Sequence, residues 1–145
     1  MSRPTWRETI AEIARAAQRR ATCHGPSEKG GYGAVIVRWK WLGACGVLVP
    51  AIVSVGYSGG APGAPHCLDV GCDPMPDPFP KYAGDVTCRR TFAHHAERNA
   101  IDLAERIEHG DELYVTDRPS CGRCEIYARE RGIGAIIIVP GFRAA

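Results

Sequence analysis

Two short stretches in the second half of the chain are the strongest indications of its fold and of a binding site. Residues 95–97 read His-Ala-Glu, and residues 119–124 read Pro-Ser-Cys-Gly-Arg-Cys. One neutral imidazole and two thiolates balance the charge of Zn²⁺ and leave its fourth position to water. We therefore predict a catalytic zinc site whose ligands are His95, Cys121 and Cys124.

The spacing of these residues supports that prediction. Cys121 and Cys124 are three residues apart where a helix would begin after Pro119, so both sulfurs should share one face of it. The positive end of that helix favours thiolates. His95 opens another predicted helix, and Glu97, two residues later, is poorly placed to be a fourth ligand on the same side. We predict that Glu97 is the general acid/base acting on the bound water.

A C-x-x-C motif alone is also typical of a redox pair or of half of a structural zinc knuckle. A lone H-x-E carries almost no information. Their occurrence together, in this order and each opening a predicted helix, favours an enzyme site over both alternatives.

Composition places the chain among ordinary globular proteins. It has 145 residues, of which 45% are hydrophobic and 23% charged, so we expect one domain spanning residues 1–145. The net charge of +2 is too small to indicate a nucleic-acid groove by itself. The first twenty residues are charged and amphipathic, and the apolar run at 42–55 is interrupted by glycine and proline, so we expect no secretory signal and no membrane span. The seven cysteines should then be reduced in the cytoplasm, several of them holding metal.

Hydrophobic periodicity and turn residues predict an alternating order of elements. These are a helix from the capping box at 5–8 to about Cys23, strands at 34–37 and 51–57 joined by a long connection, a helix from His95 to a cap at Gly110, a strand at 112–116, a helix from Cys121 to Gly132, and a strand at 134–139. The order predicts the α/β class, with a central mixed sheet and helices on both faces. The metal would lie where two helix N-termini converge at the strand ends.

The segment 58–90 differs from the rest of the chain. It holds six of the eleven prolines and three cysteines, which precludes regular helix or a central strand. A loop of this length needs something to hold it. We predict a second, structural zinc on four thiolates, with His66 or His94 as alternate ligands. Its ligands would be Cys23, Cys67, Cys72 and Cys88. The alternative is a set of core cysteines without metal.

The sequence resembles the cytidine-deaminase superfamily and, within it, the deoxycytidylate (dCMP) deaminases. The superfamily resemblance rests on the H-x-E and C-x-x-C motifs. The narrower one rests on Ala21-Thr22-Cys23, Gly33-Ala34-Val35-Ile36-Val37, Gly56-Tyr57-Ser58-Gly59, Pro65-His66-Cys67, Asp69-Val70-Gly71-Cys72, Cys88-x-Arg90-Thr91 and His95-Ala96-Glu97-x-Asn99-Ala100-Ile101. It implies a three-layer α/β/α deaminase fold, a homo-oligomer, and conversion of dCMP to dUMP plus ammonia by a zinc-activated water with Glu97 as proton shuttle. It also implies regulation by dCTP and dTTP, as in many relatives.

Several segments of the sequence depart from the family pattern. Ser58 replaces an asparagine that helps to hold the sugar and base, so we predict Ser58 as a substrate contact. Ser120 is an extra residue before the first ligand cysteine, and two extra residues follow Thr91. The connection at 39–50 has no family counterpart, and from the resemblance we expect this chain to lack the C-terminal strand and helix common in relatives.

Arg89 and Arg90 are predicted to bind the 5′-phosphate, because a planar guanidinium matches phosphate geometry. The alternative is a pair of solvated surface arginines.

Three other functions remain open. The substrate could be a different cytosine species, such as a modified dCMP, dCTP or deoxycytidine. A polynucleotide deaminase acting on tRNA or single-stranded DNA would need a basic, aromatic groove, for which Trp39 and Trp41 are the candidates. A non-enzymatic zinc module would explain the cysteines but gives Glu97 no role. We favour a small pyrimidine nucleotide as the partner over a nucleic acid.

Overall fold

In the computed structural model of the chain, the described residues are 2–22, 31–44, 46–60, 62–63, 66, 93–117 and 121–141. Its elements are α1 (Trp6–Gln18), β1 (Gly33–Leu42), β2 (Val47–Tyr57), β3 (Gly59–Gly60), β4 (Ala93–His94), α3 (Ala96–Leu103), β5 (Glu112–Thr116), α4 (Gly122–Glu130) and β6 (Ala135–Val139). Within this part of the chain, no helix is long and apolar enough to cross a membrane.

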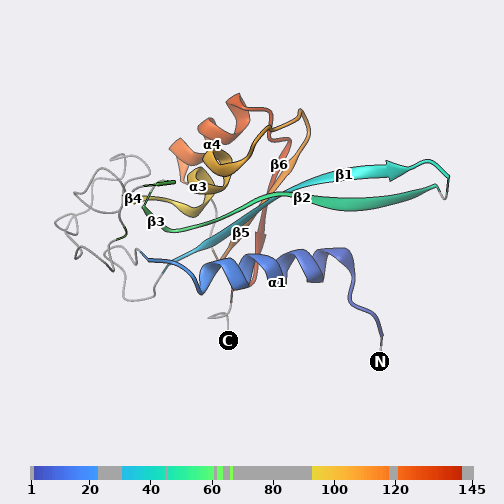
Figure 1. Ribbon diagram of the computed structural model, residues 1–145, viewed down its shortest axis with the longest axis horizontal. Coiled ribbons are helices and arrows are strands. Elements are labelled where there is room, and N and C mark those ends of the chain that lie inside the picture. Colours follow the sequence, from blue (N-terminus) through green and yellow to red (C-terminus); the bar gives the residue numbers. More distant parts are fainter. Residues whose placement is uncertain are drawn as a thin grey trace.

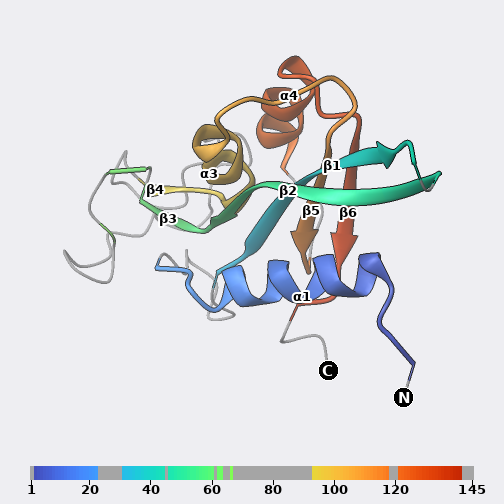
Figure 2. The same cartoon turned by 45° about the vertical axis from the view of Figure 1, so that its right-hand side comes forward.

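The main sheet has four strands in the order β2-β1-β5-β6. Strand β1 runs antiparallel to both of its neighbours, whereas β5 and β6 are parallel, so the sheet is mixed as predicted. Helix α1 covers one face, and α3 and α4 cover the other (Figures 1 and 2). Strands β3 and β4 form a separate two-stranded ribbon. The predicted α/β architecture with helices on both faces is therefore confirmed.

Alternation of side chains along the central strands builds a core on each face of the sheet. On the side of α3 and α4, the buried cluster is Ala34, Ile36, Ala96, Ala100, Ile101, Leu113, Val115, Ala128 and Ile133. On the side of α1, it is Ile10, Ala11, Ala14, Val35, Val37, Tyr114 and Val139. Successive residues of β1 and β5 enter opposite clusters, so both strands are buried on both faces.

Helix α1 begins at the predicted capping box, in which Thr5 and Glu8 bond each other's backbone. It ends at Gln18, before the predicted limit at Cys23. The Gln18 side chain donates to the carbonyl of Gly31, and the Thr22 N–H donates to Ser58 (2.9 Å), so the chain turns away toward the sheet. Cys23 itself lies outside the described residues.

The prediction of a long connection between the first two strands was wrong. Strands β1 and β2 are paired to their tips, where Leu42 is opposite Val47, so only residues 43–46 connect them. Pro50 is tolerated inside β2 because this strand lies at the edge of the sheet. We call residues 38–42 and 47–51 the arm. Since β5 pairs with β1 at Ala34–Val37, the arm extends past the third strand and projects from the body (Figure 1).

Helix α3 ends at Leu103, so the predicted extension to Gly110 was also wrong. A long-range ion pair reshapes the chain after the helix. The Arg38 guanidinium donates to both carboxylate oxygens of Asp111 (2.9 and 2.8 Å) and to the carbonyl of Arg106. Asp111 also accepts the Glu108 N–H (2.9 Å). These bonds hold an irregular turn where the sequence pattern continues a helix.

The C-terminal elements follow the sequence closely. Cys121 is the N-cap of α4, and Gly132, with φ 104°, stands just past its C-cap. Strand β6 is parallel to β5, as its wholly apolar sequence predicted. It nevertheless lies at an edge of the sheet, and Ile138 is 51% exposed.

Candidate metal centre

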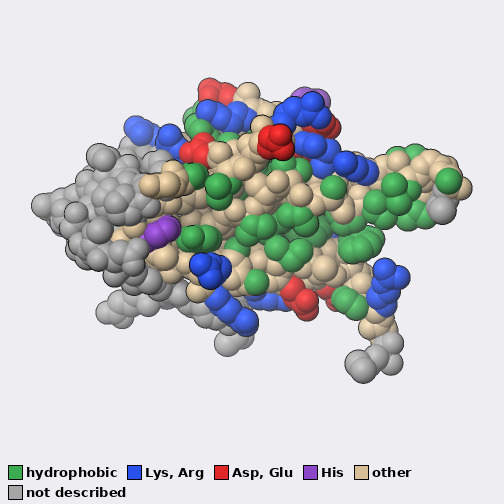
Figure 3. Space-filling model, in the orientation of Figure 1, with side chains coloured by type: hydrophobic (Ala, Val, Ile, Leu, Met, Phe, Trp, Pro, Cys, Tyr) green, Lys and Arg blue, Asp and Glu red, His purple; other side chains and the backbone are tan. Residues whose placement is uncertain are grey.

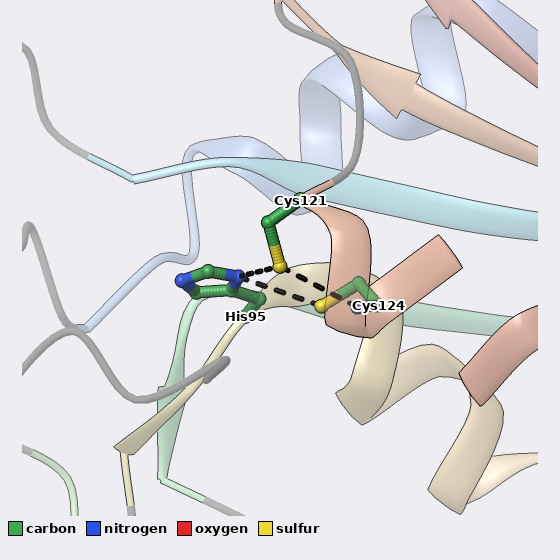
Figure 4. A group of neighbouring side chains, drawn as sticks. All are labelled: His95, Cys121 and Cys124. Carbon is green, nitrogen blue, oxygen red and sulfur yellow. Dashed lines mark hydrogen bonds between the residues drawn. The ribbon is translucent and has the colours of Figure 1, made fainter. Parts of the chain in front are cut away.

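Two helix N-termini bring the predicted ligands together. His95 is the N-cap of α3, Cys121 is the N-cap of α4, and Cys124 lies in the first turn of α4. Both N-caps have extended backbone, which turns their side chains back toward the helix starts. Figure 4 shows the imidazole and the two sulfurs pointing toward one another from these elements.

The distances within this cluster match those of a zinc site. Nδ1 of His95 is 3.6 Å from Sγ of Cys121 and 3.5 Å from Sγ of Cys124. In a tetrahedral site with Zn–S ~2.3 Å and Zn–N ~2.0–2.1 Å, nitrogen and sulfur are about 3.5–3.6 Å apart. Among the described residues, these three form the group whose ligand atoms all lie within 4.8 Å of one another. The donor set and its geometry therefore fit zinc.

Cys121 is prepared for metal binding by its neighbours. Its hydrogen bond with the Cys124 thiol lowers the pKa of Cys121 to about 4, helped by His95 and by the Cys124 N–H and opposed by burial. The Cys124 N–H lies 3.4 Å from the Cys121 sulfur. The thiolate is the form of cysteine that binds metal, so the arrangement favours a bound cation.

Glu97 lies two residues into α3 and its side chain is fully buried. Neither of its carboxylate oxygens has a hydrogen-bond partner among the described residues. Glu97 is not a member of the ligand group either, as its spacing predicted. A buried carboxylate without a partner is costly, so this group needs a donor such as a water or a ligand amine. Its catalytic role stays a prediction.

Ser58 lies at the corner between β2 and β3 and is 4% exposed. Its hydroxyl accepts the Tyr32 N–H (2.9 Å), and its own N–H donates to the Tyr32 carbonyl (3.0 Å). The side chain thus braces the corner. Its predicted contact with substrate remains untested.

His66, an alternate ligand of the predicted second zinc, lies beside this corner. Its Nδ1 is 2.8 Å from the Thr22 hydroxyl, and its ring stacks on Tyr57 with centroids 6.2 Å apart. Both rings line a cavity of about 150 Å³ together with Asn99. His94 is described through its backbone, which pairs with Gly59.

The remaining predicted residues cannot be placed. Cys23, Cys67, Cys72, Cys88, Arg89 and Arg90 lie outside the described residues. The structural zinc, its ligand set and the phosphate contacts therefore stay predictions.

Two polar residues, Asn99 in α3 and Asp117 directly after β5, were not singled out from sequence as site residues. Asn99 is 3% exposed and donates its side-chain amide to the carbonyl of Tyr57 (2.9 Å). Asp117 has φ 66°, and its carboxylate accepts from Gln18 and from the Gly141 N–H (both 2.7 Å). An amide amid the apolar stripe of α3, and an aspartate at a strand end, are the signals that could have found them.

Comparison with solved structures identifies the fold. The dCMP deaminase from the cyanophage S-TIM5 in apo form superimposes with a TM-score of 0.57 at 19% identity, covering 99% of this chain and 89% of that one. The same enzyme in complex with dCMP and dUMP gives a TM-score of 0.62 at 20% identity, covering 99% and 87%. The three-layer deaminase fold implied by the sequence resemblance is thereby confirmed.

Sequence relatives identify the family, although no family model matches the chain. The ComE operon protein 2 of Bacillus subtilis is 32% identical over 146 residues, which cover 99% of this chain and 64% of that protein. The deoxycytidylate deaminase of Mycobacterium phage D29 is 31% identical over 143 residues, covering 94% of this chain and 96% of the phage protein. With that identity over nearly the full length of both chains, the chain belongs to the deoxycytidylate (dCMP) deaminase family.

Proposed function

We propose that the chain is a zinc-dependent enzyme that deaminates a cytosine nucleotide, converting dCMP to dUMP plus ammonia. The observation that carries this proposal is the tetrahedral-compatible cluster of His95, Cys121 and Cys124, with the fully buried Glu97 on the same helix as the histidine. Family membership supports it, since the phage D29 relative is a deoxycytidylate deaminase. The cyanophage structure with dCMP and dUMP supports a mononucleotide as substrate.

The chemistry follows from the groups present. A zinc ion held by the three ligands would act as a Lewis acid and lower the pKa of a water from 15.7 to about 7. Glu97 would take a proton from the water as the water oxygen bonds to C4 of the cytosine ring. It would then pass this proton to N3 of the ring. The second proton of the water then moves through Glu97 to the amino group. The C4–N bond breaks, ammonia leaves, and C4 keeps the oxygen as the uracil carbonyl.

Burial makes Glu97 suitable for this task. Its carboxylate is shielded from bulk solvent, and both oxygens lack a partner among the described residues. An acceptor without a standing bond can take and return protons without first breaking one. The N-terminal dipoles of α3 and α4 stabilise the negative charge of the carboxylate and the thiolates.

The finer contacts of the proposal lie outside the metal cluster. Arg89 and Arg90 would bind the 5′-phosphate, and Ser58 would contribute to the sugar side of the pocket. Replacement of the family asparagine by Ser58 favours, as a second candidate, a different or modified cytosine nucleotide as substrate. We also propose a homo-oligomer with dCTP and dTTP as regulators.

A substrate panel tests the proposal directly. The zinc-loaded protein is given dCMP, 5-substituted dCMPs, dCTP, deoxycytidine and a cytosine-containing oligonucleotide, and the loss of cytosine absorbance is followed. We expect turnover of dCMP. Preference for a 5-substituted dCMP or dCTP would establish the second candidate instead. Activity confined to the oligonucleotide, or none on any substrate, would overturn the mononucleotide proposal.

Glu97→Gln tests the proton shuttle. The amide has the same shape but cannot accept a proton, so we expect kcat to fall about 10²- to 10⁴-fold while zinc content is unchanged. Glu125→Gln, in the exposed first turn of α4, removes the same charge and should leave kcat within about 2-fold, as expected of a surface change. Undiminished turnover by the Glu97 variant would show that another group moves the protons.

A further inference from the structure

Asn99 connects α3, the helix that begins after the predicted ligand His95, to the corner between β2 and β3. It lies in α3 one turn after His95, whose carbonyl accepts the Asn99 N–H (3.1 Å). Its side-chain Nδ2 donates to the carbonyl of Tyr57 at 2.9 Å and, more weakly, to that of Gly59 at 3.5 Å. The amide therefore bonds both residues that flank Ser58.

The orientation of this amide is set by its surroundings. Both groups that face Nδ2 are carbonyl oxygens, and a flipped amide would place Oδ1 against them. Oδ1 is buried and has no hydrogen-bond partner among the described residues. The two donated bonds are thus what the side chain contributes to the fold.

These bonds close a loop of contacts through His95. Gly59 begins β3, and it pairs with His94 of β4, while Gly60 pairs with Ala93. The chain runs from β4 directly into His95 and then into α3. His95 is consequently the bend between a ribbon and a helix, and Asn99 clamps that ribbon to that helix.

The corner between β2 and β3 is closely packed on both sides, which restricts its movement. A Cβ at Gly56 would lie 2.3 Å from the backbone nitrogen of Ala100, so the end of β2 touches the α3 backbone. On the other side of the corner, a Cβ at Gly59 would lie 2.3 Å from the Thr22 hydroxyl. The position of His95 relative to the sheet therefore depends on the corner, and the amide is the side-chain link between the two.

We propose that Asn99 is a positioning residue for the metal centre, holding the His95 imidazole in the orientation in which Nδ1 faces both cysteine sulfurs. The proposal shares with the proposed function the assumption that His95 is a zinc ligand. Residues that orient metal ligands typically contribute about 10- to 100-fold to metal affinity. Asn99 acts through the backbone on either side of His95, so its effect should appear in zinc binding itself, independently of turnover.

Zinc affinity, measured by competition with a chromophoric chelator, is the test. Asn99→Asp keeps the shape but removes both donors, and Asn99→Ala removes them without adding charge. We expect each variant to bind zinc about 10- to 100-fold more weakly than the wild type. Ser54→Ala is the matched control, because it deletes another hydrogen bond between β2 and α3, from the Ser54 hydroxyl to the Ala100 carbonyl (2.5 Å). That bond does not reach the corner, so zinc affinity should stay within about 3-fold.

Thermal unfolding of the three variants establishes that each is folded before zinc is added. Zinc affinity within 3-fold of the wild type in a folded Asn99 variant would overturn the proposal. An equal loss in Ser54→Ala would also overturn it, since the effect would then be a general loosening of α3. A wild type that binds zinc but deaminates no cytosine substrate would refute the proposed function and leave this test intact.

Discussion

Both ends of the β1–β2 hairpin carry hydrophobic side chains, but their surroundings are very different. At the inner end, Ala34–Val37 pair with β2 and β5, lie between helices on both faces, and are fully buried. In the arm, the ladder between the strands continues, but Trp41 is 66% exposed and Leu48 46%. Figure 3 shows hydrophobic side chains gathered on the projecting arm. Burial here is provided by the third strand and the helices, and not by the hydrophobicity of the strands themselves.

The inner end of the hairpin is also where the structure connects to the site. Strand β2 reaches the backbone of α3 at Gly56 and turns at Ser58 into the ribbon that leads to His95. The three residues of the metal cluster come from the starts of α3 and α4, and none of them belongs to the arm. Changes near the site should therefore alter activity and stability, whereas equivalent changes at the exposed positions of the arm should have small effects.

The largest expected contrast is in activity. Cys124→Ser replaces the sulfur of a buried predicted ligand by a hydroxyl, which is a poor zinc ligand, so we expect loss of bound zinc and a fall in kcat/KM of more than about 10³-fold. Leu48→Ala in the arm should leave zinc content unchanged and kcat/KM within about 3-fold, as expected of a surface change. Zinc per chain and turnover of dCMP are the measurements. A Cys124→Ser protein with normal turnover would remove Cys124 from the ligand set.

A second contrast concerns stability. Leu113 in β5 is fully buried in the core on the side of α3 and α4. Leu113→Ala should lower the free energy of unfolding by about 2–5 kcal/mol, because it removes buried methyl groups and leaves a cavity. Leu48→Ala removes the same atoms from the arm and should cost less than about 1 kcal/mol. Urea unfolding of both variants decides the matter, and equal costs would show that the arm is covered in solution.

Two glycines of the same hairpin give a smaller contrast. A Cβ at Gly56 would lie 2.5 Å from the Ala96 carbonyl oxygen as well as against Ala100, and backbone atoms cannot move aside as a flexible side chain would. Gly56→Ala should cost about 1–3 kcal/mol or more through overpacking. A Cβ at Gly43, in the turn of the arm, would meet nothing within 4 Å. Gly43→Ala should change stability by less than about 0.5 kcal/mol in the same unfolding assay. A tolerated Gly56→Ala would mean that β2 and α3 can separate.

Local patterns explain what the sequence could predict. The order of helices and strands and the three ligands of the metal cluster follow from residues within a few positions of one another, such as His95-Ala96-Glu97 and Cys121-x-x-Cys124. Capping by Thr5 and Glu8 is equally local. Such signals depend on short-range geometry, and in these segments the long-range contacts of the fold do not change the local structure.

Long-range contacts explain what it could not. The end of α3 is decided by Arg38, which lies far away in the sequence and bonds Asp111 and Arg106. The breakers Gly43, Gly46 and Pro50 indicated a long connection, yet an edge strand can accommodate the proline. The nitrogen of His95 that faces the sulfurs, and the clamp by Asn99, depend on how two helices and a ribbon meet. No local pattern encodes that arrangement.

The smallest expected effect concerns the ionisation of Cys121 in the metal-free protein. Its hydrogen bond with Cys124 is the main cause that lowers the pKa of Cys121 from 9.0 to about 4. The folded chain therefore binds fewer protons here than the unfolded chain between these values, so stability should rise with pH across that window. The contribution is complete above pH 9.0 and is lost as pH falls toward about 4. Because Cys121 is partly exposed, we expect a modest change.

Alkylation of Cys121, located by mass spectrometry across a pH series, measures this ionisation directly, because the thiolate is the reactive form. In the metal-free wild type the rate should stay on its plateau down to pH values near the lowered pKa. Cys124→Ala is the informative comparison, since it removes the principal hydrogen-bond donor and should shift the midpoint of the profile upward, toward that of an ordinary thiol. An unchanged midpoint in this variant would assign the low pKa to His95 and the start of α4. In that case the N-terminus of α4 and the His95 imidazole would keep Cys121 ionised for metal binding, and Cys124 would serve only as a metal ligand.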